Sequence, residues 1–199
     1  LTAIKELGKA DNTVVIFMSD NGGLSTGHSK KAPTSCLPLR AGKAWLYEGG
    51  VRQPLIVKWP GHIVAGATNS ETVISTDFYP TMLEMAGLPQ RPEQHLDGVS
   101  FAPLITGEAD HLEREAIYFH TPHHHHINTM GPASSVRMGD YKLIESFRSG
   151  EVELYNLKAD LGEQNNLAAQ MPELAERMKQ MLVDWRTEVD APVVKDNHK

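Results

Sequence analysis

Two short apolar segments near the start of the chain predict β-strands. Residues 13–18 form an unbroken apolar run rich in β-branched residues, which is typical of a strand buried on both faces of a parallel or mixed sheet. A second run, at residues 55–59, stops at Pro60 and Gly61, which indicates another strand followed by a turn. Residues 24–42 lie between the two runs and show no periodicity, so we expect them to form a loop.

Capping residues predict a helix in the middle of the chain. Ser75, Thr76 and Asp77 offer side chains that can cap the first turn, and Pro80 fits within that turn. Gly87 is typical of a C-terminal stop. We therefore expect a helix that begins after Asp77 and ends before Gly87.

The pattern changes near residue 116, where short apolar segments alternate with turn residues. These segments predict four strands of a small antiparallel sheet, at residues 116–119, 135–138, 141–145 and 152–155. From Pro172 onward apolar residues recur at helical spacing, which indicates an amphipathic helix that packs on this sheet. The residues of its apolar stripe are Leu174, Met178, Met181, Trp185 and Val189.

Together these elements predict an α/β protein. We expect part of a large mixed sheet flanked by helices, and a small C-terminal four-stranded antiparallel sheet packed by a terminal helix. Residues 1–115 are assigned to the C-terminal part of an α/β domain, and residues 116–199 to a small α+β subdomain. The chain begins at Leu1 in a helix-like stretch that runs straight into a strand, so we expect further residues upstream.

The composition fits a globular protein and argues against two classes of partner. Hydrophobic residues make up 40% of the 199 positions and charged residues 22%. The formal net charge is −6 and the Lys and Arg residues are scattered, so nucleic acid is a poor candidate partner. No apolar run approaches the roughly 20 residues that a membrane-spanning helix needs. Cys36 is the only cysteine, so no disulfide can form within the chain.

A polar cluster follows the first predicted strand directly. Asp20 and Asn21 place a carboxylate and an amide oxygen side by side, and Gly22 and Gly23 allow the backbone to turn sharply. Ligands bind at the carboxyl ends of strands in open α/β sheets, and oxygen donors suit a hard cation such as Ca²⁺ or Mg²⁺. The same four residues also form ordinary turns, so this cluster alone does not establish a metal site.

A second motif, at residues 39–54, joins the first in a recognisable order. The two motifs are similar to those of the sulfatase family, the arylsulfatase-like branch of the alkaline-phosphatase superfamily. Its members carry Ser-Asp-Asn-Gly-Gly and, a loop later, Leu-Arg-Gly-Gly-Lys-Gly followed by Trp-Glu-Gly-Gly-x-Arg-x-Pro. The resemblance covers nearly the whole chain and departs at Ala41 and Ala44, where glycine is usual, and at Gln53, where valine is usual.

The resemblance implies a sulfatase, hydrolysing sulfuric esters of small molecules or saccharides, with residues 1–115 in its catalytic domain. Asp20 and Asn21 would complete a divalent metal site, most often for Ca²⁺ with Mg²⁺ as the alternative, whose other ligands are two aspartates outside this chain. Lys43 would contact a sulfate oxygen and offset charge as the ester bond breaks. The resemblance also implies a formylglycine nucleophile outside this segment and a periplasmic or secreted location.

Other residues of the second motif have a supporting role in this interpretation. We expect Glu48, Gly49, Gly50 and Arg52 to brace the loop through glycine turns and a buried hydrogen-bond network. Cys36 opens a Cys-x-Pro-x-Arg pattern, which sulfatases use to make formylglycine. However, the pattern lies downstream of the Asp-Asn-Gly-Gly motif and lacks the usual Ser or Thr before the arginine, so we interpret it as a loop cysteine.

Five of the ten histidines lie between His120 and His126. Histidine clusters bind transition metals, but four adjacent side chains on one loop cannot all reach a single ion. Related sulfatases often carry aromatic and histidine residues in the matching loop, near the mouth of the active site. By this resemblance His123 and His126 would contact the group that bears the sulfate; a solvated loop without a ligand is the alternative.

Three other functions stay open at this stage. A hydrolase of the same superfamily could act on phosphate or phosphonate esters, because the fold and the metal site alone do not fix the ester. A sulfatase-like protein could also keep the shape without the chemistry. Finally, the chain by itself could be a small metal-binding module.

Overall fold

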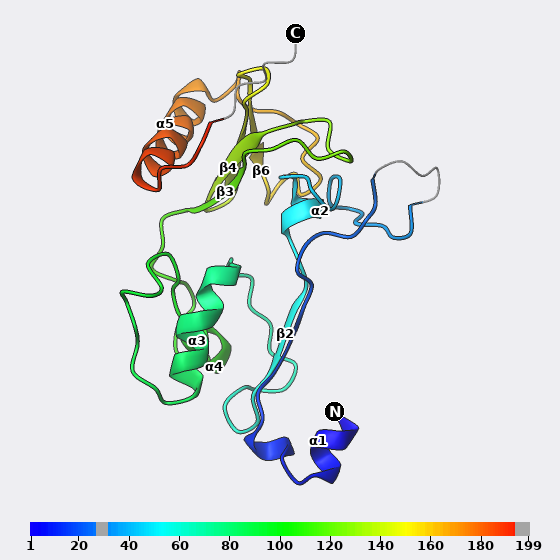
Figure 1. Cartoon of the computed structure of the whole chain (residues 1–199), viewed down its shortest axis with the longest axis vertical. Coiled ribbons are helices and arrows are strands. Elements are labelled where there is room, and N and C mark those ends of the chain that lie inside the picture. Colours follow the sequence, from blue (N-terminus) through cyan, green and yellow to red (C-terminus); the bar gives the residue numbers. More distant parts are fainter. Residues whose placement is uncertain (27–31, 194–199) are drawn as a thin grey trace. The chain divides into compact units, whose positions relative to one another are not determined.

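The structure is a computed structural model that describes residues 1–26 and 32–193 (Figure 1). The loop predicted at residues 24–42 is confirmed where it is described; residues 27–31 of it lie outside the described residues. The described part contains helices and antiparallel strands, as the α/β prediction requires.

The chain divides into two compact units. The first unit consists of Leu1–Met18 and Leu55–Arg114, and the second of Ser19–Pro54 and Glu115–Lys199. The second unit resumes at Glu115. It differs from the predicted division because it also takes in Ser19–Pro54, which the sequence analysis assigned to the first part.

The first unit contains a strand pair and short helices. Its elements are α1 (Thr2–Glu6), the 3₁₀ helix η1 (Ala10–Asn12), β1 (Val15–Met18), β2 (Leu55–Lys58), the 3₁₀ helix η2 (Ser75–Asp77), α3 (Phe78–Met85) and α4 (Ala102–Thr106). Both predicted strands are confirmed, and they pair antiparallel with Phe17 opposite Ile56. The prediction that the first strand is buried on both faces is wrong within this chain. The described part of the first unit has only this two-stranded sheet, which leaves Phe17 63% and Ile56 62% exposed.

The helix predicted before Gly87 is confirmed as α3, and Gly87 has the left-handed backbone of a C-terminal stop, with φ of +65°. Asp77 makes no side-chain capping bond to α3, but its carboxylate caps the preceding 3₁₀ helix η2, whose N-cap residue is Ile74. Its fully buried carboxylate accepts the backbone N–H groups of Ile74 (2.8 Å) and Val99 (2.9 Å) and pairs with the Arg114 guanidinium (2.7 Å). These donors, one of them a full cation, outweigh the amides of the first turn of α3.

The second unit is built on the predicted four-stranded antiparallel sheet, with the strands in sequence order. Its elements are α2 (Glu48–Val51), β3 (Ile117–Thr121), β4 (Ala133–Met138), β5 (Tyr141–Ser146), β6 (Val152–Asn156) and α5 (Pro172–Glu188). All four predicted strands are confirmed to within a few residues at their ends. Gly139, with φ of +56°, forms the turn between β4 and β5.

Helix α5 covers one face of this sheet, as predicted (Figure 1). Met178 and Leu182 are fully buried there, in one cluster with Val136 and Leu143. The buried face of α5 includes Met178 and Leu182. Val189, which we expected in the apolar stripe, follows the end of α5 and is 44% exposed.

The other face of the sheet is covered by residues 40–51, which include α2. Leu46 and Tyr47 are buried there against Ile144 and Tyr155. Side chains alternate between the faces of a strand, so neighbouring residues such as Leu143 and Ile144 serve the two opposite layers. This packing is the reason why Ser19–Pro54 belongs to the second unit.

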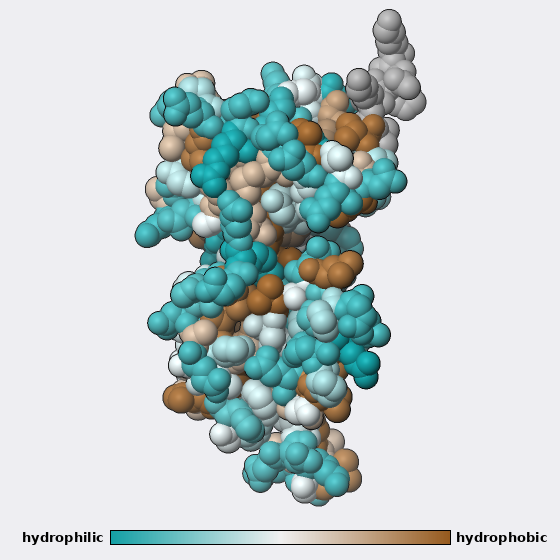
Figure 2. Space-filling view, turned by 90° about the vertical axis from the view of Figure 1, so that its left-hand side faces the viewer, coloured by the Kyte–Doolittle hydropathy of each residue, from teal (hydrophilic) through white to brown (hydrophobic). Residues whose placement is uncertain are grey.

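No helix in residues 1–26 or 32–193 is long and apolar enough to span a membrane. On the face drawn in Figure 2, hydrophobic side chains lie in scattered groups among hydrophilic ones.

The Asp77–Arg114 pair provides a test of the first unit. Asp77→Ala should lower the free energy of unfolding by about 3–5 kcal/mol, because it leaves the Arg114 guanidinium without its counter-charge. The control is Glu115→Ala, which removes an exposed ion pair with Arg177 (3.1 Å) and should cost less than about 1 kcal/mol. Urea titration of both variants measures the difference, and equal losses would contradict the assignment.

His120 of β3 makes the stability of the second unit depend on pH. One ring nitrogen lies 2.8 Å from the Ser134 hydroxyl and the other 3.0 Å from the Pro192 carbonyl oxygen. Burial lowers the pKa of the imidazole; the Pro192 carbonyl opposes this shift, and the Arg186 charge adds to it.

The unfolded chain therefore takes up this proton at a higher pH than the folded chain, so stability should fall as the pH drops through the ordinary histidine value of about 6.5. His120→Gln should flatten this slope, whereas the same change at exposed His62 should leave it in place. Urea titrations between about pH 5 and pH 8 measure the slope. A slope that persists in His120→Gln would refute its origin in this residue.

Candidate functional site

Asp20 and Asn21 lie in the turn that directly follows β1, as predicted. The Asn21 side-chain amide donates to one Asp20 carboxylate oxygen (2.6 Å), and the Ser19 hydroxyl donates to the Asn21 carbonyl (2.9 Å). The second carboxylate oxygen and the Asn21 amide oxygen accept no other bond from described residues. The turn thus holds two neighbouring oxygen donors of the kind that hard cations prefer.

Lys43 lies on the segment of residues 40–52, called the lysine loop below, which is held against this turn by backbone hydrogen bonds. The Lys43 N–H donates to the Gly23 carbonyl (3.0 Å), and the Gly22 N–H donates to the Gly50 carbonyl (3.0 Å). A Cβ atom on Gly22 would lie 2.0 Å from the Gly49 carbonyl oxygen, so the close approach requires glycine. The structure therefore brings together the two segments that carry the predicted metal ligands and the predicted lysine, and the Lys43 side chain is exposed.

Ala41 and Ala44 show why glycine is usual at their positions. Their φ angles are +58° and +73°, in the left-handed region. An L-residue in this region costs roughly 1–2 kcal/mol. The lysine loop of this chain therefore has the backbone path that its motif predicts, but it is strained at both residues.

The loop with the histidines, residues 122–132, is attached next to Lys43. The side-chain amide of Asn128 donates to the Ala44 carbonyl (2.9 Å), and the Asn128 N–H donates to the His125 carbonyl (2.9 Å). His123 and His126 are exposed on this loop, and the His126 ring stacks on that of His125 (4.5 Å). Sequence reasoning missed Asn128, because a single asparagine in a loop carries no pattern.

The described residues do not form a complete metal centre. In residues 1–26 and 32–193, no three His, Cys, Asp or Glu side chains are grouped so that they could hold a metal ion. Asp20 and Asn21 are oxygen donors and fit a hard divalent cation as two of its ligands. Any further ligands have to come from elsewhere.

Cys36 lies in a turn and does not open a helix. Its thiol is half-buried and lies 3.7 Å from the carbonyl oxygen of Gly23. This setting matches the interpretation of Cys36 as a loop cysteine packed beside the turn.

The bracing role predicted for Glu48 is confirmed, and its main partner is Lys142 of β5. The Lys142 ammonium lies 2.9 Å from Glu48 Oε1 and 3.0 Å from Glu163 Oε1. Burial raises the pKa of Glu163, and the Lys142 charge opposes this shift. Arg52 lies at the edge of the cluster, 3.8 Å from Glu48.

Arg40 joins the base of the lysine loop to the sheet. Its guanidinium lies 3.7 Å from the centre of the Tyr47 ring and donates to the Tyr155 hydroxyl (2.8 Å) and the Glu163 carbonyl (2.8 Å). Burial, with Glu153 adding to it, raises the pKa of Tyr155 to about 12, so this phenol stays neutral.

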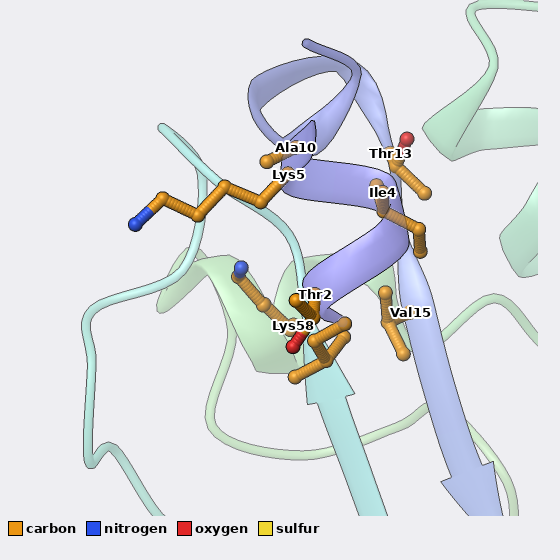
Figure 3. A pocket seen from close by; sticks show the side chains of 8 residues that line it. Thr2, Ile4, Lys5, Ala10, Thr13, Val15 and Lys58 are labelled. Carbon is orange, nitrogen blue, oxygen red and sulfur yellow. The ribbon is translucent and has the colours of Figure 1, made fainter. Parts of the chain in front are cut away.

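The described residues line at least two clefts. One, of about 370 Å³, borders the lysine loop and combines aromatic with charged side chains, among them Arg40, Trp45, Arg148 and Glu153. The other, of about 190 Å³, lies beside α1 in the first unit; Lys5 and Lys58 are its charged residues (Figure 3). The second cleft includes none of the predicted site residues.

Comparison with known proteins assigns the chain to a family. The family model described as N-sulphoglucosamine sulphohydrolase, C-terminal, matches residues 41–188. The chain belongs to the sulfatase family. The resemblance drawn from the sequence motifs is thus confirmed.

Two curated members of the family align with nearly the whole chain. A sulfatase from Formosa agariphila is 40% identical and covers 93% of this chain. Human arylsulfatase A is 33% identical and covers 97% of it. The chain spans only 35% of the first relative and 41% of the second.

Solved structures of related proteins share the fold. The crystal structure of Ps i-CgsB in complex with k-i-k-neocarrahexaose has a TM-score of 0.77 at 30% identity, and it covers 92% of this chain and 38% of that one. A phosphonate monoester hydrolase from Silicibacter pomeroyi has the same fold, with a TM-score of 0.67 at 20% identity; it covers 94% of this chain and 37% of that one. The predicted α/β fold is confirmed by these likenesses.

The strain in the lysine loop of this family member is testable. Ala44→Gly should raise the free energy of unfolding by about 0.5–1 kcal/mol, because relief of the left-handed backbone exceeds the entropy that glycine adds to the unfolded chain. Ala86→Gly is the matched control: Ala86 is exposed, its φ is −87°, and glycine there should not stabilise the protein. Thermal and urea unfolding of both variants measure the effect, and a loss of stability in Ala44→Gly would contradict the account.

Proposed function

We propose that this chain is the C-terminal portion of a sulfatase and helps to hydrolyse a sulfate ester. The observation that carries the proposal is the pair of backbone hydrogen bonds between the Asp20–Asn21 turn and the lysine loop. These bonds bring an acidic oxygen donor set and an exposed ammonium onto adjoining segments. A monoanionic sulfate ester and its counter-cation need both kinds of partner.

Lys43 acts on the sulfate in this proposal. Its ammonium donates to a non-bridging sulfuryl oxygen and offsets the charge that moves onto the sulfuryl and leaving-group oxygens as the S–O ester bond breaks. It needs no proton transfer for this role, since a point charge held in place is sufficient. The nucleophile, a hydrated formylglycine by family analogy, belongs to a part of the protein outside these residues.

Asp20 and Asn21 would hold a divalent cation, with Ca²⁺ favoured over Mg²⁺. A carboxylate and an amide oxygen are ligands that Ca²⁺ takes readily in flexible geometry, whereas Mg²⁺ demands near-octahedral sites. When bound, the cation would polarise the sulfate. The hydrogen bond from the Asn21 side-chain amide to the Asp20 carboxylate holds the two side chains next to each other.

We propose a sulfated saccharide or a small sulfated molecule as the substrate, with His123 and His126 near the group that bears the sulfate. Two features support this class. The histidine loop is bonded to Ala44, next to Lys43, and the cleft beside the lysine loop combines an aromatic wall with arginines, which suits a polar, anionic ring. The similar protein Ps i-CgsB was crystallised with a neocarrahexaose.

Lys43→Met tests the central role. In the complete protein this change should lower kcat for an aryl sulfate by about 10²–10³-fold with little change in KM, because the lost contact strengthens in the transition state. Lys158→Met, at a 79% exposed lysine of the same unit, should leave kcat unchanged. Stopped assays with chromogenic sulfate measure both.

The same assay separates the proposed reaction from its closest rival. An aryl sulfate, an aryl phosphate and an aryl phosphonate are compared at equal concentration. Faster turnover of the phosphate or phosphonate would show that the protein is not primarily a sulfatase. An unchanged kcat in folded Lys43→Met would show that Lys43 takes no part in the reaction.

A further inference from the structure

Three ionisable side chains lie together in the interior of the second unit. The Lys142 ammonium pairs with Glu48 at 2.9 Å and with Glu163 at 3.0 Å, and the side chains are 1%, 3% and 0% exposed. They come from β5, from α2 and from the segment after β6, which are far apart in the sequence. We call this group the buried triad.

Stability alone does not explain the buried triad. The free-energy cost of removing charges from water often exceeds the gain from their mutual attraction. Apolar residues of similar volume can commonly replace such clusters without loss of stability. Within the triad two carboxylates share one ammonium, so hydrogen bonding of the carboxylate oxygens is incomplete. Glu48 Oε2 has no hydrogen-bond partner among the described residues, and its nearest other cations are Arg52 at 3.8 Å and Arg137 at 4.0 Å.

The triad fixes the position of α2 relative to β5. An apolar contact tolerates sliding, whereas the energy of a buried ion pair depends steeply on distance because the surroundings screen it poorly. Glu163 adds a second constraint, since its Oε2 accepts the backbone N–H of Glu48 (2.7 Å). At the start of α2 the side chain is therefore fixed to β5 by Lys142, and the main chain is fixed by Glu163 to the segment that follows β6.

This anchor is connected to Lys43 over a short path. The Arg52 N–H donates to the Glu48 carbonyl (2.8 Å), which closes the single turn of α2. Gly50 within that turn accepts the N–H of Gly22, and Gly23 accepts the N–H of Lys43. A displacement of α2 from the sheet would therefore move the backbone at Gly22 and Gly23, directly after the Asp20–Asn21 turn, and with it the position of Lys43.

We propose that Lys142 and Glu163 are positioning residues, which hold α2 on the small sheet and so fix Lys43 relative to the Asp20–Asn21 turn. The proposal rests on the proposed function, in which Lys43 contacts the sulfate. Misplacing a catalytic group by about 1 Å can cost about 100-fold in rate. Loosening this anchor should therefore lower kcat without touching any residue that meets the substrate.

Three variants of the complete protein separate anchoring from general stability. Lys142→Met removes the ammonium with little change in volume. Glu163→Gln keeps the shape and an acceptor for the Glu48 N–H but weakens the pull on Lys142, and it serves if Lys142→Met does not fold. Lys158→Met is the control, because its exposed pair with Asp140 (3.9 Å) lies in the same unit.

The first measurement is hydrogen exchange, which does not depend on activity. The amides of Gly49, Gly50 and Arg52 should exchange at least tenfold faster in Lys142→Met or Glu163→Gln than in the wild type and in Lys158→Met. Unchanged exchange at these amides in a folded variant would overturn the anchoring.

The second measurement is a double-mutant cycle with Lys43. Lys142→Met should lower kcat about 10-fold to 100-fold with KM nearly unchanged, and this effect should vanish in a Lys43→Met background, because residues that act through one another are not additive. The same fold-loss in both backgrounds would overturn the positioning role. If the wild type hydrolyses no sulfate ester, the proposed function fails, and the exchange result still upholds or overturns the anchoring.

Discussion

The seating of the lysine loop on the small sheet is the contact on which the second unit depends. An antiparallel sheet commonly leaves one face to water. Here α5 covers one face and residues 40–51 cover the other, so both sets of alternating side chains are buried. Without the lysine loop, Ile144 and Tyr155 would face solvent. The sheet therefore needs the segment that carries Lys43 as much as that segment needs the sheet.

Apolar and polar contacts have different roles between the lysine loop and the small sheet. Leu46 and Tyr47 bury surface, which stabilises the contact but is not directional. The position of the loop is fixed by directional contacts. These are the ion pair of Lys142 with Glu48, the hydrogen bond from Arg40 to the Tyr155 hydroxyl, and the backbone hydrogen bonds at the glycines. The result is a loop whose position is set at several points by groups with strict geometry.

Elements that depend on local pattern could be predicted from the sequence. The four strands of the small sheet follow from alternation and turn residues, and α5 follows from helical spacing. The turn at Asp20 and the lysine of the candidate site were found because each lies in a compact motif. Family resemblance also explained the loop's supporting residues, since Glu48 is buried and bonded as expected.

Partners that meet only in the fold could not be predicted. Lys142 lies 94 positions from Glu48, and in the sequence it reads as the polar residue of an alternating strand. Asp77 has the position of a helix cap and caps η2, but its ion pair with Arg114, 37 residues later, leaves no trace in the local pattern. The exposure of Phe17 was missed for a different reason. A run of apolar residues indicates that both faces of a strand are apolar. Whether those faces are buried depends on the neighbouring elements that cover them.

The separation between Lys43 and the buried triad resolves a conflict between charge and rigidity. Burying an amine holds it still but disfavours its charged form, whereas an exposed lysine keeps its charge and loses its fixed position. Here the Lys43 side chain is exposed, and Glu48, five residues later, is buried and paired with Lys142. In the proposed mechanism Glu48 supplies the fixed position and Lys43 supplies the charge that meets the sulfate. A loop built in this way can present a full positive charge at a defined place. That combination is what the stabilisation of a sulfuryl transition state requires.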